Sequence, residues 1–229
     1  MPLNIVPICN ALSADRLSPY RAIAGNDLEA LRLYQHNIML TEALSTPIHV
    51  LEVVLRNRFE VFLTKRYNSA WFQDTGLLTI LSGHDEERQI NKAKATLTQE
   101  GKAHTSGRIV AELQFGFWTG LLNRRYRGQF WGPAWRTLLP QQTMLSSKPT
   151  SVDLSRLEGQ IVRDLHMLRR LRNRVSHHEP IWNDPDLWTK HQTLLKLLSW
   201  MEPEACEWLV HAQLNRFPGV YQMLKGLQP

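Results

Sequence analysis

The sequence predicts an all-α protein, and two observations lead to that prediction. Apolar residues recur at roughly helical spacing along most of the chain, and residues typical of helix starts and helix ends separate these stretches. The apolar/polar alternation of strands is scarce. The 229 residues, 43% hydrophobic and 21% charged, are enough for one large domain or two small ones. We expect a single helical domain over residues 1–229, with a linker at 140–151, where Ser, Thr and Gln gather.

The N-terminal part predicts a series of helices. The first lies at 12–23 and has Ser13 as its cap. The second, over 26–44, is indicated by apolar residues at near-helical spacing: Leu28, Leu31, Tyr34, Ile38 and Leu40 to Leu44. Pro47 either kinks this helix or starts the next one, which continues to about Tyr67.

The middle of the chain predicts two helices of opposite character. Residues 84–101 form a polar helix that has acidic residues in its first turn and is closed by Gly101. Residues 106–131 begin apolar on nearly every side, which is typical of a buried central helix. Its end carries a basic cluster that consists of Arg124, Arg125 and Arg127.

A long amphipathic helix is expected from Val152 onward. Ser151 or Asp153 can cap its start, and Glu179 ends it, because the residue before a proline is pushed out of the helical region. Its core-facing stripe consists of Leu154, Leu157, Ile161, Leu165, Leu168, Leu171 and Val175. Two closing helices follow at 184–201 and at 203–217, the second with a proline near its first turn.

The segment 168–182 gathers unusual chemistry, with four arginines, two histidines, an asparagine and a glutamate. Asn173 and His177 are four residues apart, so they share a helical face and can form a hydrogen bond, and Arg169 lies one turn earlier. Arg172 and His177 are five residues apart, which places them about 140° out of phase on a regular helix. Either the arginine side chain reaches around, or the helix loosens near its end, or another helix or a second copy of the chain completes the site.

Three interpretations of this segment compete. A metal site needs ligands one helical turn apart, whereas His177, His178 and Glu179 are consecutive, fan apart and lie among repelling arginines. An ordinary helix end would place the histidines near the negative end of the helix dipole and the arginines in water. In phosphate chemistry a histidine moves a proton, an arginine holds a phosphate oxygen and an asparagine orients either one. That set can cleave RNA, and we expect no metal and no cofactor.

The same residues resemble a known signature. "LRNRVSHHEPIW" at 171–182 is similar to the motif of Abi-like (abortive infection) proteins within the HEPN superfamily of helical ribonucleases. Two further stretches resemble this family, "LEVVLRNRF" at 51–59 and "ELQFGFWTGLLNRRY" at 112–126. With "RLSPYR" at 16–21, the resemblance covers most of the chain. It implies a HEPN-type helical bundle with additional helices.

The resemblance also implies roles for individual residues. Its Arg-x4-His motif corresponds to Arg172 and His177 as the catalytic pair, with Asn173 as their polar supporter. His178 and Glu179 fit the pattern that follows, and His178 is a second candidate for the reaction. HEPN ribonucleases typically act as dimers in which two motifs face each other across a composite cleft. Such a dimer would resolve the phase problem of the arginine and the histidine.

The function implied by the resemblance is RNA cleavage. Abi-like proteins are linked to phage defence, and some relatives are toxins restrained by an RNA or protein antitoxin. We therefore expect a metal-independent endoribonuclease that acts in phage defence or as a toxin. The alternatives on the same fold are a non-catalytic RNA-binding or protein-interaction module and a nucleotide-binding regulator.

Two groups outside the segment could support such a site. Glu52 and Arg56 are one helical turn apart, and Asn57 is next to them. They form either a surface ion pair or a network that holds the catalytic helix or contacts phosphate. The basic cluster at 124–127 either lines an RNA channel or is a solvated helix end. The net charge of +6 is consistent with an anionic partner such as RNA.

The remaining features favour a cytoplasmic protein. Cys9 and Cys206 lie far apart and form no disulfide framework or zinc-ligand spacing. The N-terminal stretch does not have the pattern of a secretory signal. We find no run of about 18 uncharged apolar residues, so we expect no membrane contact.

Overall fold

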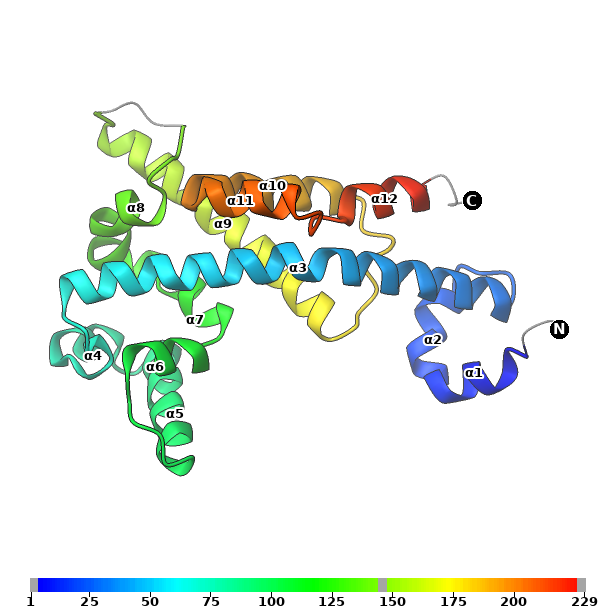
Figure 1. Cartoon of the computed structure of the whole chain (residues 1–229), viewed down its shortest axis with the longest axis horizontal. Helices are drawn as coiled ribbons and strands as arrows, with labels where there is room; N and C mark the ends of the chain where they lie inside the picture. The colour runs from blue at the N-terminus through cyan, green and yellow to red at the C-terminus, as the bar shows by residue number, and fades with distance from the viewer. Residues whose placement is uncertain (1–3, 144–147, 226–229) are drawn as a thin grey trace.

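The computed structural model describes residues 4–143 and 148–225, and all regular secondary structure in these ranges is helical (Figure 1). This confirms the all-α prediction. The helices are α1 (Val6–Leu12), α2 (Ala14–Arg21), α3 (Asp27–Arg66), α4 (Thr75–Leu81), α5 (Asp85–Gln99), α6 (Ser106–Glu112), α7 (Phe115–Gly120), α8 (Gly132–Leu138), α9 (Ser151–Ser176), α10 (Leu187–Met201), α11 (Pro203–His211) and α12 (Phe217–Lys225). Three short helical turns are η1 (Trp71–Gln73), η2 (Arg124–Tyr126) and the π-helical η3 (Arg127–Trp131).

Helix α3 is the axis of the fold. Its 40 residues extend about 60 Å and run along the long axis of the molecule in Figure 1. Helices α2, α7, α8, α9, α10 and α12 all pack against it. Pro47 lies inside α3, so of its two alternatives, a kink or a new helix start, the helix start is excluded. Leu44, Ile48 and Leu51 around it are buried, and this packing outweighs the one helical hydrogen bond that proline cannot donate.

The buried face of α3 near its start differs from the predicted one. Leu28 and Ile38 of the expected apolar stripe are 44% and 49% exposed. The buried positions there are Ala30, Leu33 and Asn37, whereas Leu40 and Leu44 of the expected stripe are buried as predicted. Tyr20 of α2 packs with Ala30 and Leu33, and Asn37 meets the loop after α9, so the neighbouring segments determine which of two apolar faces is buried.

Helix α3 is also more apolar than the sequence analysis anticipated. By length and composition alone it could cross a membrane, with a mean hydropathy of 1.5 over an 18-residue window, of which 39% is buried inside the protein. A buried helix at the centre of a helical fold meets the same criteria. In this structure α3 supplies core residues from Leu33 to Leu63.

Several helix ends lie where the sequence predicts them. Ser13 caps α2, because its hydroxyl oxygen accepts a hydrogen bond from the backbone N–H of Arg16 at 3.3 Å. Helix α5 begins with three acidic residues and is followed by Gly101 at φ +66°. The cap of α9 was misplaced in the sequence analysis. It is Thr150, whose side chain and that of Asp153 each bind the backbone N–H of the other residue.

The single buried helix expected at 106–131 is not present. The chain forms α6 and α7 there, with extended backbone at Leu113 and Gln114 between them, and then the turns η2 and η3. Glycines at several positions in this stretch lower its helix propensity. The burial was predicted correctly for α7, where Phe117 and Trp118 are fully buried.

The C-terminal part contains one helix more than predicted. Helices α10 and α11 lie at the expected places, and α11 has Pro203 at its first turn. Its expected end at Phe217 is wrong, since α11 stops at His211 and the separate helix α12 starts at Phe217. Helix α9 buries its predicted stripe from Leu157 to Val175, because this face meets α3, α7 and α10.

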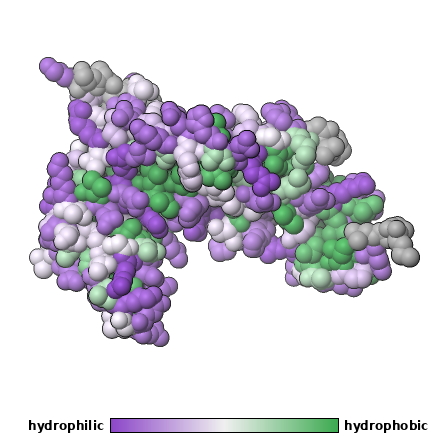
Figure 2. Space-filling view, viewed as in Figure 1, coloured by the Kyte–Doolittle hydropathy of each residue, from purple (hydrophilic) through white to green (hydrophobic). Residues whose placement is uncertain are grey.

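The arrangement of these helices leaves a hollow beside the end of α9. In the view of Figure 1, α1 and α2 lie below one end of α3, and α4 to α7 lie below the other. The C-terminal end of α9 projects between these two groups. The space-filling view of the same face is hollowed there (Figure 2). The charged segment that stands out in the sequence therefore ends in a concave part of the surface.

Candidate active site

The end of α9 has a defined backbone geometry. Ser176 is the last helical residue, and the backbone N–H of His177 still binds the Asn173 carbonyl at 2.9 Å. The next two N–H groups then bind back to the helix, from His178 to Val175 at 3.2 Å and from Glu179 to Arg174 at 2.8 Å. His178 has φ +55°. This is a Schellman motif, in which a left-handed residue, usually glycine, satisfies the last helical carbonyls.

This geometry keeps Arg172 and His177 on different sides of α9. The helix opens before Pro180, as one of the alternatives expected, but only after His177, where His178 has φ +55°. The Nε of Arg172 donates to Glu52 of α3, with 3.3 Å between Nε and the carboxylate oxygen. These two side chains are 30% and 18% exposed, whereas His177 is exposed. The bond between Asn173 and His177 is a backbone bond, and no side-chain bond joins them in the described structure.

The contacts of Glu52 distinguish the two interpretations of the group Glu52, Arg56 and Asn57, a surface ion pair or a supporting network. The surface ion pair with Arg56 does not form, because Glu52 pairs with Arg172 across the interface between α3 and α9. The Nε of Arg56 is buried without a hydrogen-bond partner in the described part of the chain. Asn57 is exposed. Glu52 therefore belongs to a contact that fixes the arginine of the motif.

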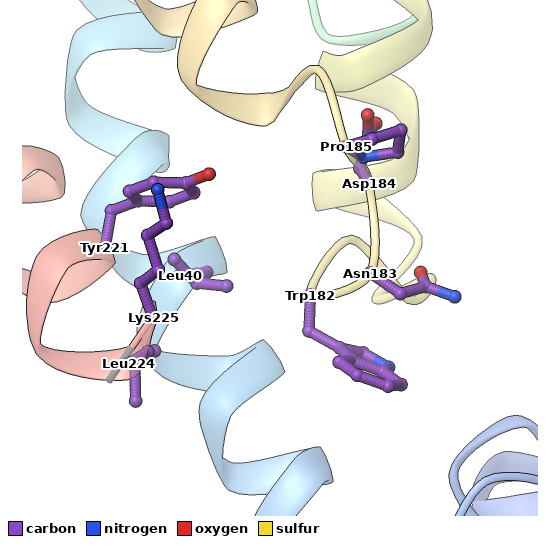
Figure 3. Close-up of a pocket in the computed structure, with 8 residues that line it drawn as sticks. All are labelled: Leu40, Trp182, Asn183, Asp184, Pro185, Tyr221, Leu224 and Lys225. Atoms are coloured by element: carbon purple, nitrogen blue, oxygen red, sulfur yellow. The ribbon is translucent and has the colours of Figure 1, made fainter. Parts of the chain in front are cut away.

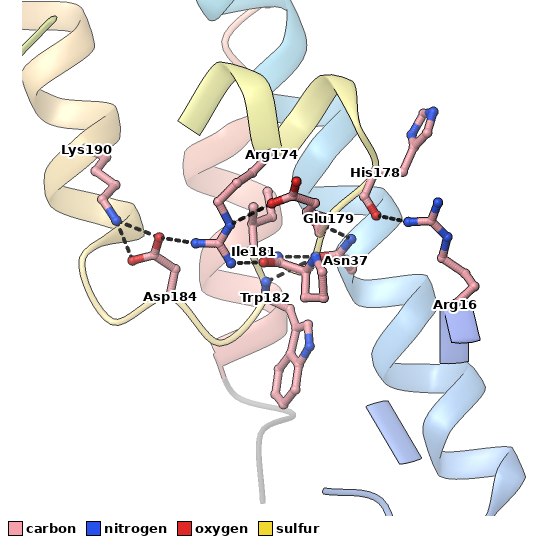
Figure 4. A network of polar contacts seen from close by, with 10 residues as sticks. Arg16, Asn37, Arg174, His178, Glu179, Ile181, Trp182, Asp184 and Lys190 are labelled. Atoms are coloured by element: carbon pink, nitrogen blue, oxygen red, sulfur yellow. Dashed lines mark hydrogen bonds and ion pairs between the residues drawn. The ribbon is translucent and has the colours of Figure 1, made fainter. Parts of the chain in front are cut away.

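Asn37 of α3 holds the loop that follows the motif (Figure 4). Its side-chain oxygen accepts hydrogen bonds from the backbone N–H groups of Ile181 and Trp182, at 2.6 and 3.2 Å. Its amide nitrogen donates to the Glu179 carbonyl at 3.3 Å. Asn37 is only 2% exposed. A buried asparagine with three such bonds fixes the path of the loop, because each unpaired group would lose free energy.

Arg174 braces the same loop from the helix side. Its guanidinium donates to the Pro180 carbonyl and, at 3.2 Å, to Asp184. Asp184, 5% exposed, also accepts from Lys190 of α10. On the opposite side Arg16 of α2 donates to the His178 carbonyl at 2.7 Å (Figure 4). Side chains from α2, α3, α9 and α10 thus hold the backbone on which the exposed histidines sit.

Aromatic packing ties the N-terminal helices to the loop. Trp182 stacks on Tyr20 of α2, with ring centroids 6.4 Å apart, and Tyr34 of α3 meets Tyr20 edge-on at 5.3 Å. Burial raises the pKa of Tyr20 to about 12, so this hydroxyl stays protonated at neutral pH. The pair Arg16 and Tyr20 therefore anchors α2 against the backbone that follows the motif.

A cavity of about 330 Å³ lies on the other side of this loop (Figure 3). It is lined by Leu40, Trp182, Asn183, Asp184, Pro185, Tyr221, Leu224 and Lys225. Neither Arg172 nor His177 belongs to its lining. The candidate active site is therefore the exposed helix end and the hollow beside it, and not this cavity.

The basic cluster at 124–127 is not close to the motif. Arg127 binds Ser155 and forms an ion pair with Glu158, which lies 14 residues before Arg172, or about 21 Å along α9. Arg125 donates to the ring nitrogen of His84 at 2.9 Å. The structure does not bring these arginines together with Arg172 and His177, and Arg127 instead lies beside the first turns of α9.

The other expected supporting residues surround the helix end. Arg169 is half-buried, and its guanidinium lies beside Gly116 of α7, 4.0 Å from where a Cβ would be. Glu179 is exposed and lies 3.9 Å from Arg174. The residues that the sequence analysis missed are Asn37, Arg16, Asp184 and Lys190. For Asn37 a signal was present, since it lies between Leu33 and Leu40 at core-facing spacing.

The geometry of the described residues does not assemble a metal site. No group of three or more His, Cys, Asp or Glu side chains lies close enough together to hold an ion in residues 4–143 and 148–225. What the helix end offers is an exposed imidazole, an amide and several guanidinium groups. This set can transfer a proton and hold a phosphate.

The backbone of His178 leads to a prediction about its role. Glycine at this position is expected to leave the free energy of unfolding unchanged or to raise it by up to about 1 kcal/mol, because glycine adopts positive φ without strain. His178→Val is expected to lower it by about 1–2 kcal/mol. Urea unfolding measures both. If His178→Gly destabilises as much as His178→Val, the imidazole itself stabilises the fold and the backbone explanation is wrong.

The comparisons with known proteins give no relative. No protein-family model, no curated protein and no solved structure matches this chain.

Proposed function

We propose that this protein is a metal-independent endoribonuclease of the HEPN type, similar to Abi-like proteins, with Arg172, Asn173 and His177 in its active site. The observation that carries the proposal is the end of α9. There an exposed histidine is held on a backbone fixed by Asn37 and Arg174, while Arg172 is fixed by Glu52. A group that must meet a reacting atom needs this kind of positioning.

The proposed reaction is an intramolecular transesterification, in which the ribose 2′-oxygen replaces the 5′-oxygen on the phosphorus. A ribose 2′-hydroxyl attacks the neighbouring phosphorus. His177 takes the proton of this hydroxyl or gives one to the leaving 5′-oxygen, and water carries out the other of these two proton transfers. The phosphorus–5′-oxygen bond breaks, which leaves a 2′,3′-cyclic phosphate and a 5′-hydroxyl. Arg172 stabilises the charge that develops on the phosphate oxygens. No metal or cofactor takes part in this scheme.

The proposed active form is a homodimer. Arg172 pairs with Glu52 while His177, five residues further along α9, is exposed, and this arrangement supports a site that two chains complete. In a symmetric dimer the same surface of each chain meets its copy. The arginine of one chain can then lie beside the histidine of the other and complete one active site. The biological setting proposed is the cytoplasm, in phage defence or as a toxin that an RNA or protein antitoxin restrains.

The decisive experiment is RNA cleavage in EDTA. The purified protein is expected to cut single-stranded RNA and to leave 2′,3′-cyclic phosphate ends. His177→Ala is expected to reduce the rate by a factor of about 10² to 10⁴, the usual contribution of a positioned proton-transfer group. His211→Ala, which removes an exposed imidazole at the end of α11, serves as the matched control, and His178→Gly is measured beside it because His178 is the second candidate for the reaction.

Four results would contradict the proposal. One is a His177→Ala variant that cuts as fast as the parent, and another is cleavage that stops in EDTA and returns with a divalent metal. The third is RNA binding without cleavage, which would favour the non-catalytic RNA-binding module. Ends that carry a 5′-phosphate would also exclude attack by the 2′-hydroxyl.

A further inference from the structure

A row of exposed arginines runs along α9 to His177. Arg156, Arg163 and Arg170 follow one another at intervals of seven residues, and His177 comes seven residues after the last of them. All four side chains are exposed. Residues seven apart in an α-helix differ in direction by only about 20°, so these four form one row on the outer side of α9, opposite the buried stripe.

The arginines of this row are available to an anion. None of the three forms an ion pair with a carboxylate in the described part of the chain, whereas Arg125 and Arg127 of the basic cluster bind groups of the protein. Arg163 makes one hydrogen bond, to Gln160 at 3.0 Å, and its guanidinium lies over Gly159. Asp153, three residues before Arg156, is engaged with Thr150 in the cap of the helix.

The dimensions of the row fit a nucleic-acid strand. Successive arginines are about 10.5 Å apart along the axis, and the row from Arg156 to His177 spans about 31 Å. A stacked strand advances about 3.4 Å per nucleotide, so the row corresponds to about nine nucleotides. Guanidinium groups at this spacing can each hold a phosphate of one continuous strand.

A membrane surface fits the row less well than RNA does. A helix that lies on a membrane inserts an apolar face into it. The apolar face of α9, from Leu157 to Val175, is buried against the rest of the protein. The exposed side therefore has charge but no apolar side chains to insert near Arg163 and Arg170.

We infer that the arginine row Arg156, Arg163 and Arg170 is the binding track for a single strand of RNA and leads its phosphate backbone to His177. This inference rests on the proposed ribonuclease function, and it places the substrate on α9 and not on the basic cluster at 124–127. A straight row follows a single strand over its whole length. Each strand of a duplex winds around the duplex axis, so it stays beside a straight row for only part of one helical turn.

The test measures binding without cleavage. The probes are fluorescein-labelled 2′-O-methyl RNA strands of 4 and 12 nucleotides, which lack the attacking hydroxyl, and a 12-base-pair duplex. Fluorescence anisotropy gives the affinity between 50 and 200 mM salt. The variants are the triple Arg156→Gln, Arg163→Gln, Arg170→Gln and the matched triple Lys65→Gln, Lys92→Gln, Arg108→Gln. The control residues are exposed and lie on α3, α5 and α6, and both triples lose three positive charges.

The expected result follows from counterion release. Each phosphate contact contributes about 0.7 to the slope of log affinity against log salt for a single strand, so the row triple is expected to lower the slope of the 12-mer by about 2. The control triple is expected to keep the parental slope. The 4-mer is long enough for at most two of the arginines and is expected to have a smaller slope.

Four outcomes would overturn the inference. Two concern the slope, which would stay unchanged in the row triple or fall equally in both triples. Two concern the ligand: the row would bind the duplex more tightly than the single strand, or it would bind vesicles with 30% phosphatidylserine in place of RNA. The inference and the nuclease proposal can fail separately. Row-dependent binding in a protein that does not cut RNA refutes only the nuclease, and cleavage that depends on His177 but not on the row refutes only the track.

Discussion

A mixture of the inactive variants Arg172→Ala and His177→Ala is expected to regain up to about a quarter of the parental RNA cleavage. Random exchange of subunits makes about half of the dimers mixed. Each mixed dimer combines an intact Arg172 from one chain with an intact His177 from the other at one of its two sites. The physical basis is the position of the two side chains on different sides of α9, with Arg172 turned toward Glu52.

The measurement is the initial rate of cleavage after the two variants have been incubated together under conditions that allow exchange. The double variant Arg172→Ala, His177→Ala, mixed with the parent, is the control, because it dilutes intact chains without complementing them. If the two single variants stay inactive together although mixed dimers form, the arginine and the histidine act within one chain. A monomer in solution during cleavage would also contradict the composite site.

Asn37→Leu is expected to lower the free energy of unfolding by about 3 kcal/mol and to reduce RNA cleavage at least tenfold. Leucine has a similar size but cannot accept from the N–H groups of Ile181 and Trp182. A buried backbone group without its partner costs about 1–3 kcal/mol. The loop then moves, and a shift of about 1 Å at a reacting group can lower the rate about 100-fold.

Asn57→Leu is the matched control for this variant. Asn57 lies on the same helix, is exposed, and changes to the same residue, so its free energy of unfolding is expected to stay within about 0.5 kcal/mol of the parent. Urea unfolding and RNA cleavage are measured for both variants. Equal stability of Asn37→Leu and the parent would show that the loop does not depend on its bonds to Asn37. A strong loss of stability without loss of cleavage would separate the loop from the chemistry.

Features that depend on neighbouring residues in the sequence were predicted well. The Ser13 cap, the acidic start of α5 and the buried stripe of α9 are local, because capping bonds and helical periodicity span only a few residues. The cap of α9 was placed wrongly because three polar residues, Thr150, Ser151 and Asp153, compete there. Only Thr150 has Asp153 at the distance that a capping box requires.

Features that depend on distant residues were not predictable in the same way. The start of α3 is apolar on two faces, and the predicted stripe includes Leu28 and Ile38, which are exposed, but not Leu33, which is buried. The bond from Glu52 to Arg172 joins residues 120 apart, and the bond from Ile181 to Asn37 joins residues 144 apart. The sequence thus indicates the motif at the end of α9, but the side chains that hold it come from helices whose faces only the assembled fold defines.

Helix α3 carries both side chains that hold the motif, Glu52 and Asn37. Glu52 holds Arg172, and Asn37 holds the loop after His177, and the two anchors are 15 residues or about 22 Å apart on α3. The length of α3 between Asn37 and Glu52 therefore sets the distance between the contact that holds Arg172 and the contact that holds the loop after His177. Pro47, the position where α3 lacks a helical hydrogen bond, lies between Asn37 and Glu52. A bend at this residue would change the spacing of both supports in one movement, without any change in the motif itself.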